Sequence, residues 1–311
     1  FTFIVYDNDN RQTHLKDVMR MEIRRSLETP SDSLHIVFLY SELVYELFKI
    51  KVLYNNQEIF FGNIDRQKIV RSDKGNFLSI EARNPATALI ECESLPQLYY
   101  NLSLEDAYNI FIRPYGIEKL HTPSNPSVRM FKVEKGTSEW ESFCNFCSFS
   151  MNSYPTIVGN EIYANNKTPD THHYITETTD YMEMEYIFNH YDGITMIYMY
   201  NPDNGVYQYV LANSQIANKW PPRIRYYTTK KEEIPYKEQI IRKKYRDSLK
   251  TLHACRITFH GFRAYKIGDS MSIDDALMKI FNGTILDIKY IIDSNGFFTV
   301  TEIGNGKRNI S

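Results

Sequence analysis

Two cysteines and two histidines come nearest, by type and spacing, to a metal or redox site. Cys144 and Cys147 are separated by two residues, and His172-His173 offer two further ligands. A zinc site built on such a cysteine pair usually needs a second pair, and no second cysteine pair exists. Both cysteines also fall on the apolar face of a predicted helix, together with Phe143. We therefore interpret them as packing residues and predict no metal and no cofactor.

The other residues capable of acid–base or nucleophilic chemistry form no recognisable catalytic motif. The eight histidines are scattered, and none belongs to an H-E-x-x-H or deaminase-type pattern. The sequence contains no G-x-S-x-G nucleophile elbow. Glu91 and Glu93 flank Cys92, but glycoside hydrolysis requires two acidic groups facing each other across a cleft. We predict that the protein is not an enzyme.

The composition favours a mostly β protein and argues against a dedicated nucleic-acid binder. The 311 residues include 24 Tyr and 18 Phe but only 13 Gly, and aromatic residues are enriched in strands. The sequence pI is about 6.5, whereas nucleic-acid-binding domains usually exceed about 9. Four cysteines are too few for a disulfide framework, and we expect all four, Cys92, Cys144, Cys147 and Cys255, to be reduced and buried as small hydrophobic residues. No apolar run reaches the roughly 18 residues of a membrane span, and no signal peptide is evident, so we expect a cytoplasmic protein.

The near-zero net charge conceals two oppositely charged segments. Seven acidic residues and one lysine lie between Glu161 and Asp192, whereas eleven basic and four acidic residues lie between Lys219 and Lys250. Three interpretations stay open. The charges can be ordinary solvated faces, complementary surfaces that dock copies or partners, or, for the basic segment, a nucleic-acid contact.

The order of predicted elements divides the chain into three parts. Residues 1–85 read as short strands with turn residues between them, which is typical of a β-barrel or sandwich. Residues 86–171 read as a small α+β domain with two short helices and a hairpin. Residues 172–311 return to strands, with a helix inserted near 233–253. No residue-level repeat is evident between the two β parts, and whether they share a fold stays open.

Local signals support the two helices of the middle part. Ser103 and Ser138 each begin a capping box, S-L-E-D and S-E-W-E, and apolar residues then follow at helical spacing. Pro114 and Gly116 are expected to end the first helix. Hairpin turns are predicted at residues 55–56, 73–76, 159–160, 202–205 and 295–296.

Two groups of residues are candidates for an assembly interface. Tyrosine is enriched at protein interfaces, because it combines a large apolar area with a polar tip. The tyrosines concerned lie on one predicted hairpin and are Tyr198, Tyr200, Tyr207 and Tyr209. The second group is the basic side of the inserted helix, formed by Arg242, Lys243, Lys244, Arg246 and Lys250. Charge reversal at Lys243, Lys244 and Arg246 is expected to block assembly while the monomer stays folded.

Several motifs, in order along nearly the whole chain, resemble the late-control-D or baseplate hub family of contractile tails. The first barrel of that family carries a G-x-I-D motif and a closing R-[DN]-x-x-x-x-L motif, here Gly62 to Asp65 and Arg83 to Leu89. The segments 102–117, 132–164 and 237–264 are similar to its later helices and strands. Two motifs depart from the family: G-R-D reads Ala82-Arg83-Asn84, and G-W-R reads Gly261-Phe262-Arg263.

The resemblance implies a fold and an assembly. The fold is mostly β (α+β), with two tail-tube-like antiparallel β-barrels, a small α+β domain between them and a helical insertion in the second barrel. The family's hubs are homotrimers, so three copies present six similar barrels that join a hexameric tail tube above to a trimeric spike below. Other baseplate proteins are further partners; no specific nucleic-acid binding is expected, although DNA would pass through the lumen in a phage.

The resemblance places the protein in the tail baseplate of a phage, an R-type bacteriocin or a related contractile injection system, assembled in the bacterial cytoplasm. Two alternatives of other classes stay open. One is a tail-associated cell-wall hydrolase, for which turnover of peptidoglycan is the discriminating observation. The other is a carbohydrate-binding tail-tip module, which is expected to be monomeric or dimeric and to bind glycans.

Overall fold

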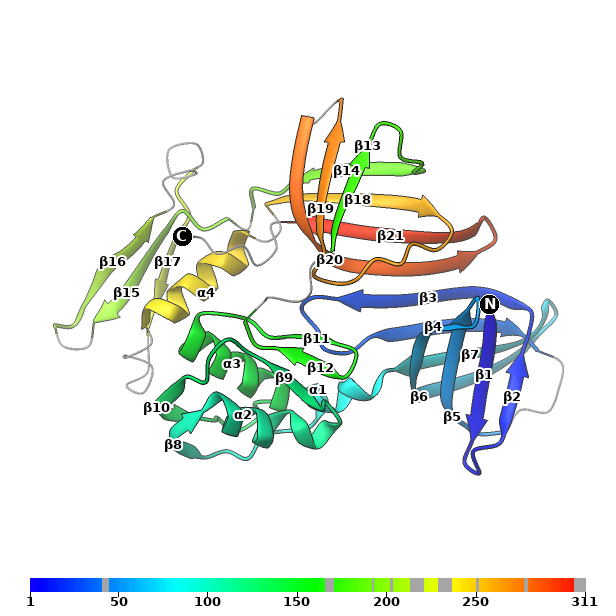
Figure 1. Cartoon of the computed structure of the whole chain (residues 1–311), viewed down its shortest axis with the longest axis horizontal. Helices are drawn as coiled ribbons and strands as arrows, with labels where there is room; N and C mark the ends of the chain where they lie inside the picture. Colours follow the sequence, from blue (N-terminus) through cyan, green and yellow to red (C-terminus); the bar gives the residue numbers. More distant parts are fainter. Residues whose placement is uncertain are drawn as a thin grey trace.

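The computed structural model describes most of the chain (Figure 1). The described residues are 1–40, 45–165, 171–191, 193–201, 204–212, 221–228, 237–249, 252–276 and 279–304. The candidate residue Lys250 lies outside them, as do the side chains of Tyr209 and Arg246.

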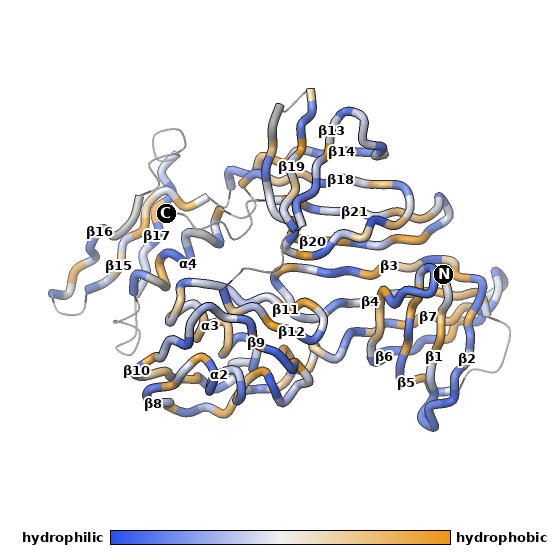
Figure 2. The backbone as a smooth tube through the Cα atoms, viewed as in Figure 1, coloured by the Kyte–Doolittle hydropathy of each residue, from blue (hydrophilic) through white to orange (hydrophobic). Residues whose placement is uncertain are grey.

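Seven strands form the first β unit. They are β1 (Thr2–Asp7), β2 (Gln12–Leu15), β3 (Val18–Ser26), β4 (Ser33–Leu39), β5 (Leu47–Tyr54), β6 (Gln57–Ser72) and β7 (Gly75–Arg83). Apolar and polar residues alternate along them, as Figure 2 shows. In β4, for example, Leu34, Ile36 and Phe38 are buried and the residues between them are not. This period of two places one face of each strand in the core.

Six strands form the second β unit. They are β13 (His172–Thr176), β14 (Glu183–Phe188), β18 (His253–His260), β19 (Ser270–Asp275), β20 (Lys279–Asp293) and β21 (Gly296–Gly304). The hairpin predicted around residues 295–296 is present, because β20 and β21 pair antiparallel with Asp293 opposite Gly296.

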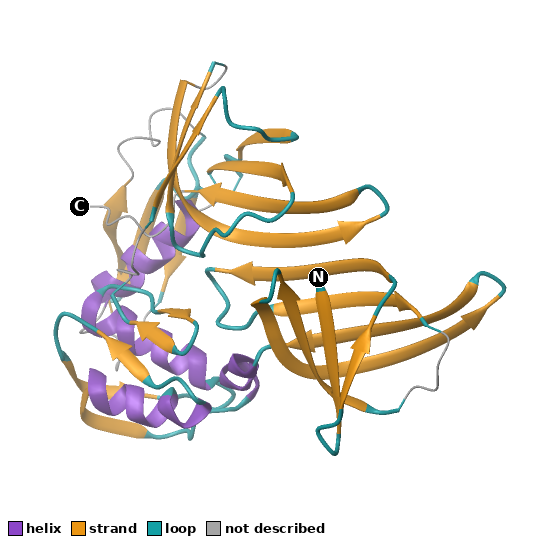
Figure 3. Ribbon diagram, turned by 45° about the vertical axis from the view of Figure 1, so that its right-hand side comes forward, coloured by secondary structure: helices purple, strands orange, loops and turns teal. Residues whose placement is uncertain are grey.

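The two β units belong to one sheet. The sheet has 13 strands, and its main path runs β14-β18-β21-β20-β3-β4-β7-β6-β5-β1-β2, with β19 and β13 branching from β20. The mostly β class is therefore confirmed. The described strands do not close on themselves, so the two separate closed barrels expected from the sequence are not found among them. Figure 3 shows instead two bent sheet regions lying next to each other.

One hydrophobic core spans both β units. Buried residues of β4 and β18 belong to the same cluster, among them Ile36, Phe38, Ile257 and Phe259, all with no exposed area. Burial of a large apolar side chain contributes about 1.5–3 kcal/mol. The shared core therefore stabilises the junction between the units as well as each unit.

The middle unit contains the predicted helices. Its elements are η1 (Pro85–Thr87), α1 (Ala88–Glu91), β8 (Leu98–Ser103), α2 (Leu104–Phe111), η2 (Arg113–Tyr115), β9 (Lys119–His121), β10 (Ser127–Lys132), α3 (Glu139–Met151), β11 (Thr156–Val158) and β12 (Glu161–Tyr163). Ser103 caps α2 through a full capping box with Asp106, and Ser138 Oγ accepts a hydrogen bond from Glu141 N at 3.1 Å. The boundaries proposed for this unit, residues 86–171, stay a prediction.

The cysteines serve as packing residues, with one correction. Cys144 and Cys147 of α3 are buried, and Cys147 lies in the core of the middle unit. Cys255 is buried in the large sheet, where burial raises the pKa of its thiol to about 12. Cys92, which the sequence was expected to bury as well, is only half-buried. It follows the short helix α1, near the surface of the middle unit.

The insertion in the second β unit is larger than a helix. Between β14 and β18 lie β15 (Met196–Asn201), β16 (Val206–Ala212), β17 (Ile224–Tyr227) and α4 (Lys237–Leu249). The three strands pair with one another in the order β16-β15-β17 and form a sheet of their own. Ile197 and Met199 pack with Ile241 and Tyr245 of α4 in a separate small core. The hairpin assigned from sequence to the second barrel thus belongs to this inserted unit. No described helix is long and apolar enough to cross a bilayer.

Candidate assembly surfaces

The two β units repeat one topology. In the first unit the strand order is β3-β4-β7-β6-β5, and in the second it is β14-β18-β21-β20-β19. The strands also follow the same order along the chain, except that the inserted unit separates β14 from β18. The repeat covers these five strands. It does not extend to the next strand, because β1 pairs antiparallel with β5 whereas β13 pairs parallel with β19.

The repeat also holds residue by residue. Residues 33–83 align with residues 254–304 without a gap, and the strand pairs have the same register in both units except at the end of β5, where the shift between Val52 and Leu53 has no counterpart in β19. The matching pairs are Ile36–Ile80 with Ile257–Thr301, and Ile50–Gly62 with Met271–Gly283. The sequence analysis missed this repeat. Its signal is the motif I-F-x-G-x-I, found at 59–64 and again at 280–285.

The two repeated glycines mark the bend in each long strand. A Cβ on Gly62 would lie 2.4 Å from the Arg83 carbonyl oxygen, and a Cβ on Gly283 would lie 2.7 Å from the Gly304 carbonyl oxygen. Both distances are too short for a real contact of a Cβ atom, so only glycine fits at these two positions. An irregularity in the register follows two residues later in each strand, between Ile64 and Arg66 in β6 and at the matching place in β20. Glycine and bulge together turn each strand from one neighbour to the next.

The first unit joins the second through β3 and β20. These strands pair antiparallel from Met21 opposite Ile292 to Ser26 opposite Asp287. Ile23 lies opposite Tyr290, and neither side chain has exposed area. On the outer face, Arg24 Nε donates to Asp287 Oδ2 at 2.9 Å.

Arg25 fastens this junction from the first unit. Its guanidinium lies 5.5 Å from the centre of the Tyr290 ring, donates to Asp32 Oδ2 at 3.1 Å, and donates to the Ile59 carbonyl oxygen. Burial raises the pKa of the Asp32 carboxyl, and Arg25 acts in the opposite direction. A half-buried arginine that contacts a ring, a carboxylate and a carbonyl oxygen fixes the relative position of the strands that carry them.

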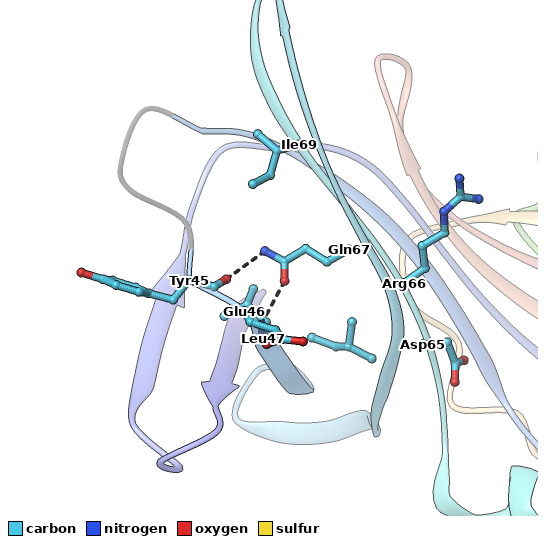
Figure 4. Close-up of a pocket in the computed structure, with 8 residues that line it drawn as sticks. Tyr45, Glu46, Leu47, Asp65, Arg66, Gln67 and Ile69 are labelled. Atoms are coloured by element: carbon cyan, nitrogen blue, oxygen red, sulfur yellow. Dashed lines mark hydrogen bonds between the residues drawn. The ribbon is translucent and has the colours of Figure 1, made fainter.

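Two edges of the sheet have no such partner among the described strands. β14 is hydrogen-bonded to β18 alone, and residues beyond Asn63 in β6 are paired with β7 alone. An open pocket of about 410 Å³ lies against this edge of β6 (Figure 4). It is lined by Tyr45, Glu46, Leu47, Ile64, Asp65, Arg66, Gln67 and Ile69. The Gln67 amide bridges the backbone of Tyr45 and Leu47 at 3.0 and 2.9 Å.

The basic helix predicted as an interface is partly used within the chain. Lys243 Nζ donates to Asn145 Oδ1 of α3 at 3.3 Å and lies 5.0 Å from the centre of the Tyr154 ring. Burial lowers the pKa of its ammonium group. Lys244 lies over the Tyr227 ring at 4.6 Å, whereas Arg242 is exposed. Lys243 thus holds α4 against the middle unit, whereas Arg242 and Lys244 are exposed.

Three of the predicted tyrosines, Tyr198, Tyr200 and Tyr207, lie on the face of the inserted sheet opposite to Ile197 and Met199, which pack against α4. Tyr200 and Tyr207 are paired across β15 and β16, and Tyr209 is the register partner of Tyr198. The sequence analysis missed Tyr226 of β17, which is 60% exposed and lies 5.4 Å from Tyr198 and 5.2 Å from Tyr207, centre to centre. The face is therefore a larger aromatic surface than the hairpin alone provides.

The fold matches known tail proteins over its whole length. A tail protein from Neisseria meningitidis MC58 aligns with a TM-score of 0.77 at 14% identity, over 98% of this chain and 96% of that one. The 43 kDa tail protein of prophage MuSo2 from Shewanella oneidensis aligns with a TM-score of 0.80 at 13% identity, over 97% of each chain. The Escherichia coli c3393 protein, a component of the type VI secretion system, aligns at 0.57 and 8% identity, over 92% of this chain and 73% of that one.

No protein-family model and no curated protein sequence matches the chain. At identities this low the structural matches establish a shared fold, and they do so over lengths close to the whole of the two phage-type tail proteins. The sequence motifs resemble those of tail proteins, and the fold is shared with tail proteins. The chain therefore has the fold of phage tail proteins, and its resemblance to the baseplate hub family of contractile injection systems is confirmed.

Proposed function

We propose that the protein is the structural hub of a contractile-tail baseplate and works as a homotrimer. The observation that carries the proposal is the residue-level repeat of the two β units. Three copies of a chain with two matching units present six similar surfaces around one axis. A trimer can meet a sixfold tube only if each subunit offers two near-equivalent surfaces.

In this proposal the hub joins the hexameric tail tube on one side to a trimeric spike on the other. The structural neighbours support a role in tails, since two of them are tail proteins and a third belongs to the type VI secretion system. The role is mechanical and needs no catalytic group. We propose the baseplate of a phage, an R-type bacteriocin or a related injection particle as the location.

The proposal is tested by the mass of the protein in solution, alone and mixed with the tube and spike proteins of its particle. We expect a trimer, either alone or with those partners. A chain that stays monomeric or dimeric in every mixture contradicts the hub. Release of soluble fragments from peptidoglycan by the purified chain would favour the cell-wall hydrolase instead, and binding of glycans by a monomer would favour a tail-tip module.

A further inference from the structure

The β3–β20 junction within one chain suggests how two chains could pair with each other. It uses the edge strand of the first unit, β3, and the outer half of the long strand of the second unit, β20. The repeat supplies one more copy of each of these parts. The counterpart of β3 is β14, and the counterpart of the outer half of β20 is the outer half of β6. Both of these edges lack a partner among the described strands, as do the outer edges of β2 and β13.

We propose that β14 of one subunit pairs antiparallel with the outer half of β6 of the next subunit, in the register of the β3–β20 junction. The proposal rests on the hub function, because it names the surface through which a homotrimer closes. Carried over from the internal junction, the register places Met184 opposite Arg71, Tyr186 opposite Ile69 and Phe188 opposite Gln67. Each subunit then offers one edge and accepts another, which is a head-to-tail contact that closes into a ring.

Exposed apolar side chains at both edges support this pairing. Ile69 is 52% exposed, although its counterpart Tyr290 is fully buried against β3. Phe188, at the end of β14, is also 52% exposed. Large apolar side chains are usually buried, so an exposed one on each of these two unpaired edges indicates a partner.

The pocket beside β6 lies where that partner strand would enter. It is lined by residues 64–67 and 69 of β6 (Figure 4), whose counterparts in β20 include Asp287, Ile288 and Tyr290, three of the residues that pair with β3. In the internal junction this space is filled. The pocket thus lies beside β6 at the position that β3 occupies beside β20.

The charges of the four strands select the pairing. β14 carries Glu183 and Glu185, whereas the outer half of β6 carries Arg66, Lys68 and Arg71. The internal junction has the opposite polarity. There Arg24 of β3 contacts Asp287 of β20, which lies beside Lys289, the register partner of Arg24. Pairing of β3 with β6 would instead place Arg24 and Arg25 near Arg66, Lys68 and Arg71, and this like-charge contact disfavours that wrong pairing.

Disulfide trapping tests the register. Ile187 is expected to lie opposite Lys68 on the outer face, at the distance of about 4.5–5.5 Å between Cα atoms that a disulfide can bridge. Chains carrying Ile187→Cys and chains carrying Lys68→Cys are mixed, assembled and oxidised. We expect covalent dimers from the mixture and none from either variant alone, because β14 meets β6 and never a second β14.

A register control completes the test. Ile187→Cys mixed with Ile69→Cys places the two thiols on opposite faces of the sheet, so we expect little cross-linking. The wild-type chain, with its half-buried Cys92, is oxidised in parallel. A particle that is trimeric by mass but gives no 187–68 cross-link overturns the edge pairing and leaves the hub function in place. A chain that never forms a trimer contradicts both.

Discussion

Ile69 and Tyr290 occupy the same position of two repeated strands, yet Tyr290 has no exposed area and Ile69 is 52% exposed. The difference comes from their neighbours across the strand edge. Tyr290 lies opposite Ile23 of β3 and beneath the guanidinium of Arg25, whereas the same edge of β6 faces the pocket. The two positions are therefore matched in the fold but differ in what covers them.

This difference predicts opposite effects of substitution. Tyr290→Ala removes a fully buried ring and is expected to lower the free energy of unfolding by about 3–5 kcal/mol, as for other large aromatic residues. Ile69→Lys introduces a charge at an exposed position and is expected to change the free energy of unfolding by no more than about 0.5 kcal/mol. It should nevertheless prevent trimer formation, because the lysine would be buried without a partner at the proposed junction. Urea unfolding and solution mass of both variants check the prediction; a trimer of Ile69→Lys with wild-type stability contradicts it.

The bend glycines give a second prediction. Gly62→Ala and Gly283→Ala each place a methyl group less than 3 Å from a carbonyl oxygen of the next strand. Such overpacking typically costs about 1–3 kcal/mol. The matched control is Asn63→Ala, an exposed position of the same strand, for which little change is expected. Urea unfolding midpoints of all three variants check the prediction. An unchanged midpoint for both glycine variants would contradict it, because it would mean that the neighbouring strands move apart with no loss of stability.

A carboxylate in the middle unit predicts a dependence on pH. His121 Nε2 lies 2.7 Å from Glu161 Oε2, the Tyr163 hydroxyl donates to the same oxygen at 3.0 Å, and Lys119 donates to Oε1 at 3.3 Å. These contacts, that of His121 first, lower the pKa of Glu161 below its ordinary value of 4.5. The stability that Glu161 contributes is therefore present above pH 4.5 and lost as the pH falls through the lowered pKa.

Replacement of this carboxylate tests that dependence. Glu161→Gln is expected to reduce the difference between the urea midpoints at about pH 6 and about pH 3, because glutamine keeps the size of the side chain and does not titrate. Glu105→Gln, in the first turn of α2, is a control for general charge effects. An equal loss of stability in the wild type and in Glu161→Gln over this range would show that the cluster contributes nothing.

The features predicted correctly from the sequence are those with local causes. Ser103 and Ser138 begin helices because each caps backbone N–H groups within the next three residues, and that pattern is legible in a short window. The mostly β class likewise follows from alternation within single strands. The sequence did not predict that a folded unit separates β14 from β18, because this depends on pairing between strands far apart in the chain. The hairpin at 196–212 has the same local signals whether it belongs to the large sheet or to the inserted unit.

The candidate surfaces show the same division. The tyrosines of β15 and β16 were predictable because one hairpin brings them together, whereas Tyr226 joins them through a parallel pairing with a strand further along the chain. The repeat was hidden because few residues besides the glycines and neighbouring apolar positions are shared. Gly62 and Gly283 reveal it only when their common role at the bend is known.

Helix α4 provides the last prediction, in which two neighbouring basic residues act differently. Lys243 contacts Asn145 and the Tyr154 ring of the middle unit, while Arg242 is exposed. Lys243→Glu is therefore expected to release the inserted unit from the middle unit, which limited proteolysis would detect as faster cleavage between β14 and β18. Arg242→Glu should leave proteolysis unchanged. If the basic side of the helix is an assembly surface, Arg242→Glu should still weaken assembly; equal cleavage rates in the two variants would contradict the role assigned to Lys243.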